Sequence, residues 1–227
     1  MLINGYLIRS FNSYNTFRTV DSGKSEEACV VISAKDLKAL GMTAVDRLDL
    51  PIGVQMNGTD YIEEAFTLYP TGLDEATFTV PERVALETDR VCADYEEFKY
   101  IIVGADENAT YYLDYDNRLY MLYVYVQNNF DNSIVFTTGK YTVNGVDLGN
   151  MGNTSEMYED SDEIPAKSEG LYTIAIGKGY LESLGVTEPE ELVYELEGRI
   201  YTGSGYNSDK FVEGAPTIDL TKLRKID

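Results

Sequence analysis

Runs in which the side chains alternate between two faces dominate this chain, and this period of two predicts a protein built mainly from β-strands. Residues 114–127 form the longest run. One face of a strand here would carry Tyr120, Leu122, Val124 and Val126, and the other Leu119, Met121, Tyr123 and Tyr125. Because both faces are apolar or aromatic, we expect a central sandwich strand, covered on one side by the second sheet.

The other strand-like runs are shorter and are separated by turn residues. They fall at residues 2–8, 26–32, 47–56, 65–69, 98–103, 133–138, 141–148, 170–176, 192–202 and 215–220. Asn4-Gly5, Asn57-Gly58 and Asn144-Gly145 are dipeptides that favour tight hairpins, and residues 202–206 form a glycine-rich loop. Regularly spaced strands with such turns predict antiparallel β-sandwiches of immunoglobulin-like character.

Two short helices interrupt the strands. Ser33 can cap the first, with Asp36 three residues further on, Leu37 and Leu40 on one face, and Gly41 as the left-handed stop. The second helix repeats this order with Gly177, Leu181, Leu184 and Gly185. Because so short a helix is not stable alone, we expect each pair of leucines, Leu184 included, to be buried against a sandwich.

The matching helices belong to an internal duplication. The spacing between matched positions drifts in one direction, from 140 residues for Asn4 and Asn144 to 145 residues for Tyr61 and Tyr206. Small loop insertions in a duplicated domain produce such a drift. In the second copy residues 92–142 precede the Asn-Gly pair, whereas only residues 1–3 precede it in the first copy.

We therefore predict two tandem antiparallel β-sandwich domains, each with one short helix. Residues 1–88 would be an incomplete first repeat without its N-terminal strands, and residues 89–227 a complete second repeat that folds alone. The incomplete copy would leave core-facing side chains of Ile3, Val30, Ile32 and Val54 uncovered. We expect it either to pack this face on the second repeat or to self-associate through it.

Composition narrows the list of partners. The chain has 18 Lys and Arg residues against 39 Asp and Glu residues, a net charge of −21. Because nucleic-acid binding depends on basic side chains that neutralise phosphates, neither nucleic acid nor an anionic membrane is an expected partner. No apolar run approaches the ~20 residues that a membrane-spanning helix needs, so we expect no membrane insertion, and there is no signal peptide in this chain.

Residues with catalytic potential are scarce. The chain has no histidine, which excludes Ser-His and Cys-His nucleophiles and histidine-ligated metals. No phosphate-binding loop is present. Carboxylate pairs suited to glycoside hydrolysis stay open, because any two of the 39 acidic residues could meet. We expect no enzyme activity and no cofactor.

Two cysteines are too few for a disulfide framework. Cys29 lies in the apolar run 28–32, where a buried thiol is expected, and Cys92 opens the second copy and could be buried likewise. Two groups of oxygen ligands for calcium are Asp114, Asp116 and Asn117, and Glu156, Glu159, Asp160, Asp162 and Glu163. Neither group has the EF-hand pattern, and acidic runs are usually solvated loops, so we assign no metal site.

Tyrosines are concentrated in one stretch, where they are the candidate binding residues. These are Tyr111, Tyr112, Tyr115, Tyr120, Tyr123 and Tyr125. An exposed strip of tyrosines could bind a glycan or a protein, because each ring offers an apolar face with a polar tip. The competing interpretation is that the rings pack inside the sheet with their hydroxyl groups at its rim.

Several segments of both copies carry a resemblance to a known kind of repeat. In the first copy they are residues 3–6 (Ile-Asn-Gly-Tyr), 23–28 (Gly-Lys-Ser-Glu-Glu-Ala), 32–42 and 66–73, and in the second copy residues 124–129, 143–145 and 164–186. The chain resembles immunoglobulin-like repeats of unassigned function in surface lipoproteins of anaerobic Gram-positive bacteria. The resemblance implies the fold and an extracellular or cell-envelope location, but no activity.

The functional hypothesis is a non-enzymatic cell-surface module with a structural or interaction role, whose protein or glycan partner is unknown. The alternative is a glycan- or ligand-binding domain that uses the tyrosine-rich strand face.

Overall fold

The structure is a computed structural model that describes residues 1–10, 13–15, 21, 23–25, 27, 29–56, 60–111, 114–150, 157–159, 163–201 and 206–227. The first half contains β1 (Leu2–Ile3), β2 (Tyr6–Arg9), β3 (Tyr14–Asn15), β4 (Val30–Val31), α1 (Ala34–Leu40), β5 (Leu48–Met56), β6 (Asp60–Leu68) and the 3-10 turn η1 (Glu75–Thr77). The second half contains β7 (Arg90–Asp94), β8 (Phe98–Tyr111), β9 (Asp114–Asn128), β10 (Ile134–Val143), β11 (Val146–Asn150), β12 (Met157–Glu159), β13 (Ser168–Gly177), α2 (Lys178–Ser183), β14 (Glu191–Tyr201), β15 (Tyr206–Gly214), β16 (Thr217–Asp219) and η2 (Leu220–Lys222).

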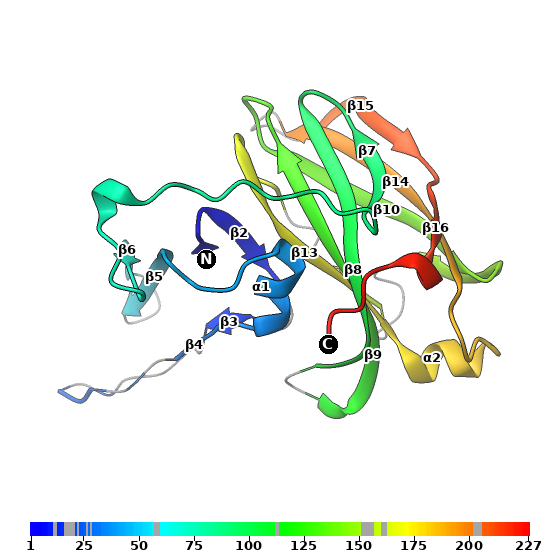
Figure 1. Cartoon of the computed structure of the whole chain (residues 1–227), viewed down its shortest axis with the longest axis horizontal. Coiled ribbons are helices and arrows are strands. Elements are labelled where there is room, and N and C mark those ends of the chain that lie inside the picture. Colours follow the sequence, from blue (N-terminus) through cyan, green and yellow to red (C-terminus); the bar gives the residue numbers. More distant parts are fainter. Residues whose placement is uncertain are drawn as a thin grey trace.

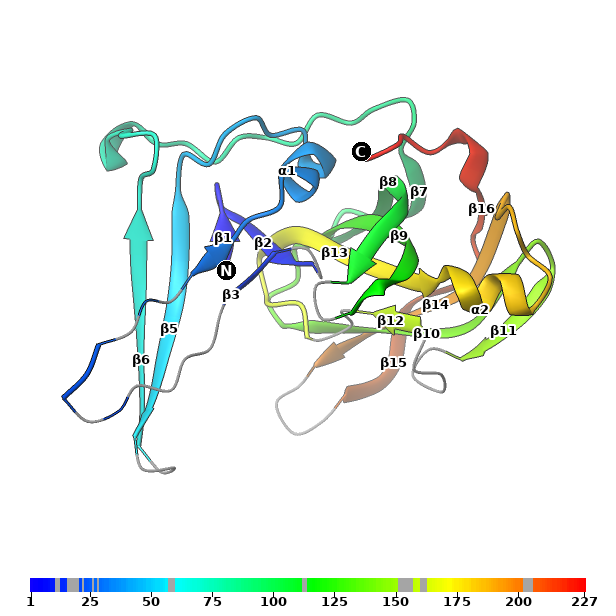
Figure 2. The ribbon, with the colours of Figure 1, turned by 90° about the horizontal axis from the view of Figure 1, so that it is seen from below.

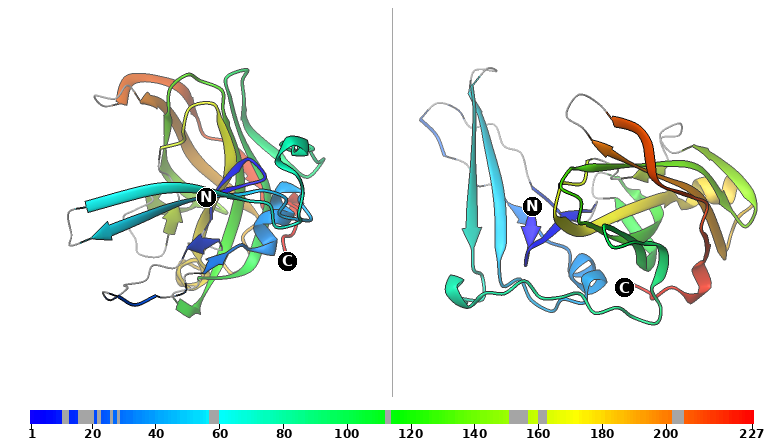
Figure 3. Two further views of the ribbon diagram at one scale, coloured as in Figure 1. Left: turned by 90° about the vertical axis from the view of Figure 1, so that its left-hand side faces the viewer. Right: turned by 90° about the horizontal axis from the view of Figure 1, so that it is seen from above.

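Two large sheets make the protein mainly β, as the alternation predicts (Figure 1). In the described part of the chain one sheet has nine strands in the order β6-β5-β1-β2-β13-β9-β8-β7, with β12 beside β13. The other has the order β11-β10-β14-β15, with β16 beside β14, and β3 pairs with β4 separately. Figures 2 and 3 show the β5–β6 hairpin standing away from the layers formed by the second half.

The core between the two large sheets is formed almost entirely by the second half. It contains Phe98, Ile102 and Tyr120 from one sheet and Phe136 and Tyr194 from the other. The ring centroids of Phe98 and Phe136 are 4.8 Å apart in a stacked arrangement. This packing of two sheets face to face is consistent with a β-sandwich.

A second core lies on the opposite face of the strands β8, β9 and β13. Met121 and Tyr123 of β9 and Leu171 of β13 meet Ile3 of β1 and Leu40 of α1. The second sheet covers one face of residues 114–127, as expected. β9 is apolar on both faces because the second sheet covers one face and the first half of the chain covers the other.

The first half shares this core with the second and has no sandwich core of its own among the described residues. The sheet also continues across the repeat boundary, because β2 pairs in parallel with β13 through Leu7 and Gly170, Ile8 and Leu171, and Arg9 and Tyr172. Packing on the second repeat, one of the two expected outcomes for the first copy, is thus present. Self-association stays a prediction.

The duplication is visible in the hydrogen bonds of the first Asn-Gly turn. Asn4 has a φ of 52°, and its side-chain oxygen accepts hydrogen bonds from the backbone N–H groups of Asp46 (2.8 Å) and Arg47 (2.9 Å). Its side-chain nitrogen donates to the carbonyl oxygen of Ala44 at 2.9 Å. The turn is thereby tied to the residues that lead into β5.

The second Asn-Gly turn makes the same contacts 140 to 144 residues later. Asn144 has a φ of 50°, accepts from the N–H groups of Glu190 (2.9 Å) and Glu191 (3.0 Å), and donates to the carbonyl oxygen of Glu188 at 2.8 Å. The strand register agrees, since Ile3 pairs with Leu48 as Val143 pairs with Leu192. The two copies therefore share a local architecture as well as a sequence pattern.

Both helices end in the predicted way. Gly41 and Gly185 have φ values of 77° and 83°. The N–H groups of the next residues, Met42 and Val186, donate to the carbonyl oxygens of Leu37 (2.8 Å) and Leu181 (2.9 Å). This is the hydrogen bond that closes a helix before a left-handed glycine. The expected burial of Leu184 is wrong: it is 37% exposed, whereas Leu181 is buried.

Candidate functional site

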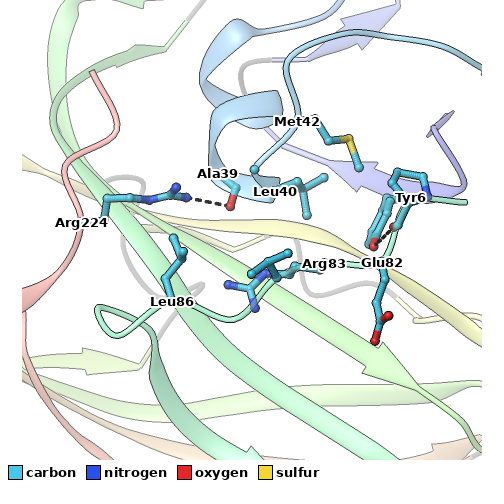
Figure 4. Close-up of a pocket in the computed structure, with 11 residues that line it drawn as sticks. Tyr6, Ala39, Leu40, Met42, Glu82, Arg83, Leu86 and Arg224 are labelled. Carbon is cyan, nitrogen blue, oxygen red and sulfur yellow. Dashed lines mark hydrogen bonds between the residues drawn. The ribbon is translucent and has the colours of Figure 1, made fainter.

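A pocket of about 210 Å³ lies where the first half meets the end of the chain (Figure 4). Its wall is formed by β2, the end of α1, the connecting segment after η1, and the C-terminal segment. The lining residues are Tyr6, Ala39, Leu40, Gly41, Met42, Pro81, Glu82, Arg83, Val84, Leu86 and Arg224. The pocket therefore contains groups from both repeats.

Arg83 is the buried cation of this pocket. Its Nη2 lies 2.7 Å from a carboxylate oxygen of Asp89, and both side chains are nearly inaccessible to solvent. The guanidinium also lies over the ring of Tyr125, 5.0 Å from the centroid. Asp89 in turn accepts the backbone N–H of Leu86 at 2.9 Å. An ion pair this deeply buried contributes mainly by fixing one arrangement of the segment around it.

Arg224 ties the C-terminal segment to α1. Its Nη2 donates to the carbonyl oxygens of Lys38 (3.0 Å) and Ala39 (2.9 Å), in the last turn of the helix. The carbonyl of Lys38 also accepts the backbone N–H of the C-cap residue Gly41 at 3.0 Å, and a cation at this end of a helix interacts favourably with the helix dipole. Burial lowers the pKa of the Arg224 guanidinium.

Two tyrosine hydroxyls border the same region. The hydroxyl of Tyr6 donates to the carbonyl oxygen of Pro81 at 2.6 Å, and burial raises the pKa of Tyr6 to about 12. The hydroxyl of Tyr125 donates to Glu169 at 2.5 Å, and burial together with this carboxylate raises the pKa of Tyr125. Both phenols therefore stay protonated at neutral pH.

The lining groups do not form a nucleophile with a neighbouring base. The arginines are engaged by Asp89 and by helix carbonyls, and the phenols carry raised pKa values. The contacts have a structural role. Side chains from residues 81–90 and from the C-terminal segment hold α1 and β2 against the second repeat. The predicted division between residues 88 and 89 falls in this segment, and a charged, strand-poor stretch gives no sign in the sequence that Arg83 is buried.

The six candidate tyrosines do not form one surface. Tyr120 faces the core between the sheets, while Tyr123 and Tyr125 face the second core, and all three are buried. They offer no exposed ring face, because β9 is covered on both sides. Tyr112 lies outside the described residues, and for Tyr111 and Tyr115 the description covers the backbone alone. For Tyr120, Tyr123 and Tyr125 the prediction of an exposed strip is therefore wrong. For Tyr111, Tyr112 and Tyr115 it stays a prediction.

The cysteines, the calcium candidates and the predicted turns are only partly covered by the described residues. Cys29 is exposed, contrary to expectation, and Cys92 is half-buried; neither forms a disulfide. The side chains of both calcium candidate groups lie outside the description, except for that of Glu163, and the turns at 57–58 and 202–205 lie outside it altogether. Among the described residues, acidic, cysteine and histidine side chains form no group of three or more placed to hold a metal ion.

No helix in the described ranges is long and apolar enough to cross a membrane. No protein-family model matches the chain, and no curated protein matches it. A crystal structure of a protein from Archaeoglobus fulgidus is similar at 11% sequence identity, over 58% of this chain and 92% of that one, with a TM-score of 0.27. A similarity at this level carries no argument about fold or function.

Proposed function

We propose that this chain is a non-enzymatic structural or interaction module of the cell surface, built from immunoglobulin-like repeats. The observation that carries the proposal is the continuous sheet across the repeat boundary. A parallel pairing of β2 with β13, a shared core and the Arg83 and Arg224 contacts would hold two repeats at a fixed angle. A fixed angle is what a spacer needs in order to present a surface at a set distance.

The sequence has no histidine, and the described groups that line the pocket of Tyr6, Arg83 and Arg224 include no nucleophile with a neighbouring base. Both observations favour this role over an enzyme. The large negative charge favours a solvated exterior. The alternative, a glycan- or ligand-binding face of tyrosines, has fewer residues available, because Tyr120, Tyr123 and Tyr125 are buried.

A pair of glycine substitutions tests the fixed joint. A Cβ atom at Gly170 would overlap the carbonyl oxygen of Leu7, so Gly170→Ala should separate β2 from β13. Gly179→Ala is the matched control, because a Cβ atom there meets nothing within 4 Å. Small-angle X-ray scattering should show a larger radius of gyration for Gly170→Ala alone, with faster proteolysis in residues 81–90. An unchanged scattering profile would contradict the rigid joint.

Location is tested separately. An antibody raised against the chain should label intact, unpermeabilised cells that express the protein from its natural gene. Labelling that appears only after permeabilisation would remove the surface assignment while leaving the rigid joint in place.

A further inference from the structure

The pocket of Tyr6, Arg83 and Arg224 contains hydrogen-bond donors that the chain itself does not use. In the described part of the chain the guanidiniums of Arg83 and Arg224 form their hydrogen bonds through Nη2 only. The Nε atom of each is buried and has no hydrogen-bond partner among the described residues. Because a buried donor without a partner loses its hydration, this arrangement favours an acceptor that enters the pocket.

The same groups give the pocket a positive charge. Arg83 and Arg224 are its cations, and Asp89 is the carboxylate beside them, with Oδ2 at 2.7 Å from Nη2 of Arg83. The three charges lie close enough to act on one another: burial lowers the pKa of Arg224, the charge of Asp89 raises it, and the charge of Arg83 lowers it. Glu82 also lines the pocket, but its side chain is exposed and its carboxylate points away from the guanidiniums (Figure 4). Among these described groups the positive charge at the centre of the pocket exceeds the negative charge by a single unit.

The remaining wall is mainly apolar. Leu40 and Met42 come from the end of α1 and the residues after it, while Val84 and Leu86 come from the connecting segment. Val84 is 76% exposed and Leu86 39%, so these two side chains lie where the pocket opens to solvent. The volume of about 210 Å³ is larger than the roughly 150 Å³ of a cavity that holds benzene. The pocket therefore has room for a ring or a branched alkyl group beside the arginines.

We propose that this pocket binds a monocarboxylate that carries an apolar group of about the size of benzene. The carboxylate would accept N–H groups of Arg83 and Arg224, because planar guanidiniums suit this anion. The apolar group would lie against Leu40, Met42 and Leu86 and thereby leave water. The single charge of the ligand balances the surplus charge of the pocket, whereas a phosphate would bring a second charge into a largely apolar site at a high desolvation cost. The inference goes beyond the proposed function and does not depend on it.

Isothermal titration calorimetry of the full chain tests the site, with 3-phenylpropanoate as the probe. We expect saturable binding with a Kd of about 0.1–1 mM, as for a ligand of this size with modest binding energy per atom. The ligand control is 3-phenylpropanamide, which keeps the ring and loses the charge. Its amide suits the buried Oδ1 of Asp89, which has no partner among the described residues, as well as the arginines. The amide should nevertheless bind at least about tenfold more weakly, because hydrogen bonds to a charged acceptor are stronger.

A pair of arginine substitutions tests the residues. Arg224→Gln should weaken the binding of 3-phenylpropanoate at least about tenfold, because it removes a charged donor from the pocket. Arg90→Gln is the matched control. Arg90 also donates to backbone carbonyls, those of Glu87 (3.2 Å), Asp89 (3.0 Å) and Lys222 (3.3 Å), but it does not line the pocket. Circular dichroism follows the folding of both variants, and the comparison of acid with amide needs no variant at all.

A peptide distinguishes two sources of the carboxylate. N-acetyl-Gly-Gly-Phe presents a similar ring and carboxylate at the end of a chain. Tighter binding of this peptide than of 3-phenylpropanoate would support a chain terminus as the ligand, and weaker binding would support a free acid.

Three results would overturn the proposal. They are no saturable binding at about 10 mM 3-phenylpropanoate, which would mean that the pocket holds water alone, equal affinities for the acid and the amide, and an unchanged affinity in Arg224→Gln. None of them bears on the scattering of Gly170→Ala, which reports the joint within the chain. Failure of the ligand site and failure of the rigid joint are therefore distinguishable.

Discussion

The two helices occupy the same place in their repeats, yet they bury different leucines. In α1, Leu40 is 4% exposed and Leu37 is half-buried; in α2, Leu181 is buried and Leu184 is exposed. α1 lies at the junction, where residues of the second repeat cover its last turn. Among the described elements, α2 lies against β9 and β13 of its own repeat. A repeated helix thus takes its buried face from its neighbours rather than from its own sequence.

The outer edges of the equivalent strands β2 and β11 also have different neighbours in the two repeats. The edge of β2 pairs with β13. At the equivalent place in β11 the chain satisfies its own backbone: the Tyr180 hydroxyl donates to the carbonyl oxygen of Leu148 at 3.1 Å, and the Asp147 carboxylate accepts the N–H of Gly149 at 2.7 Å. Natural sheets protect edges with such side chains. In the first repeat this edge pairs with a strand of the second repeat. In the second repeat side chains protect it.

Leucine substitutions give the largest test of the helix comparison. Leu40→Ala and Leu181→Ala should each lower the free energy of unfolding by about 2–5 kcal/mol, because each removes a buried side chain and leaves a cavity. Leu184→Ala should cost less than about 1 kcal/mol, since its side chain is partly in water. Urea unfolding measures all three. A Leu184→Ala loss as large as that of Leu181→Ala would reverse the assignment.

The two turn asparagines should differ by a smaller amount. Asn4 is buried and Asn144 is exposed. Asn4→Ala leaves buried backbone groups without partners and should cost about 3 kcal/mol, whereas water can replace Asn144 and Asn144→Ala should cost about 1 kcal/mol. Thermal unfolding of both variants checks the order. Equal losses would mean that water reaches the first turn as readily as the second.

Cys92 of the second repeat makes the stability depend on pH. Burial raises the pKa of Cys92 to about 11, although the Tyr194 hydroxyl donates to its sulfur at 3.4 Å and partly opposes the shift. The protonated thiol is favoured in the folded state, so this contribution is full below the ordinary pKa of 9 and is lost as the pH rises through 11. Cys92→Ala should therefore reduce the loss of stability between pH 9 and 11 by about 1–2 kcal/mol.

The smallest expected effect is a gain. Gly179→Ala lies inside α2 with open space around the new methyl group, and it should stabilise the chain by about 0.5–1 kcal/mol because alanine loses less backbone entropy than glycine. Differential scanning calorimetry would detect the rise in melting temperature. A fall would mean that the helix N-terminus needs the flexibility of glycine.

Local features were readable from the sequence because their causes lie within a few residues. The Asn-Gly turns need positive φ values, the helices end at left-handed glycines, and the period-two runs form strands. The duplication was readable too, since it repeats these features in order. The strands β3, β7, β12 and β15 were missed. β3 and β12 have only two or three residues, which carry no detectable period, and β15 contains many polar residues.

Tertiary structure alone decided which faces are buried. The sequence of β9 predicted two apolar faces. It did not predict that the first repeat covers one of them, so the exposure of the β9 tyrosines stayed open. Cys29 and Leu184 looked like core residues and are exposed, while Arg83 looked like a linker residue and is buried. Burial depends on which distant segment lies beside a residue, and in this chain that neighbour differs between the two helices and between their leucines.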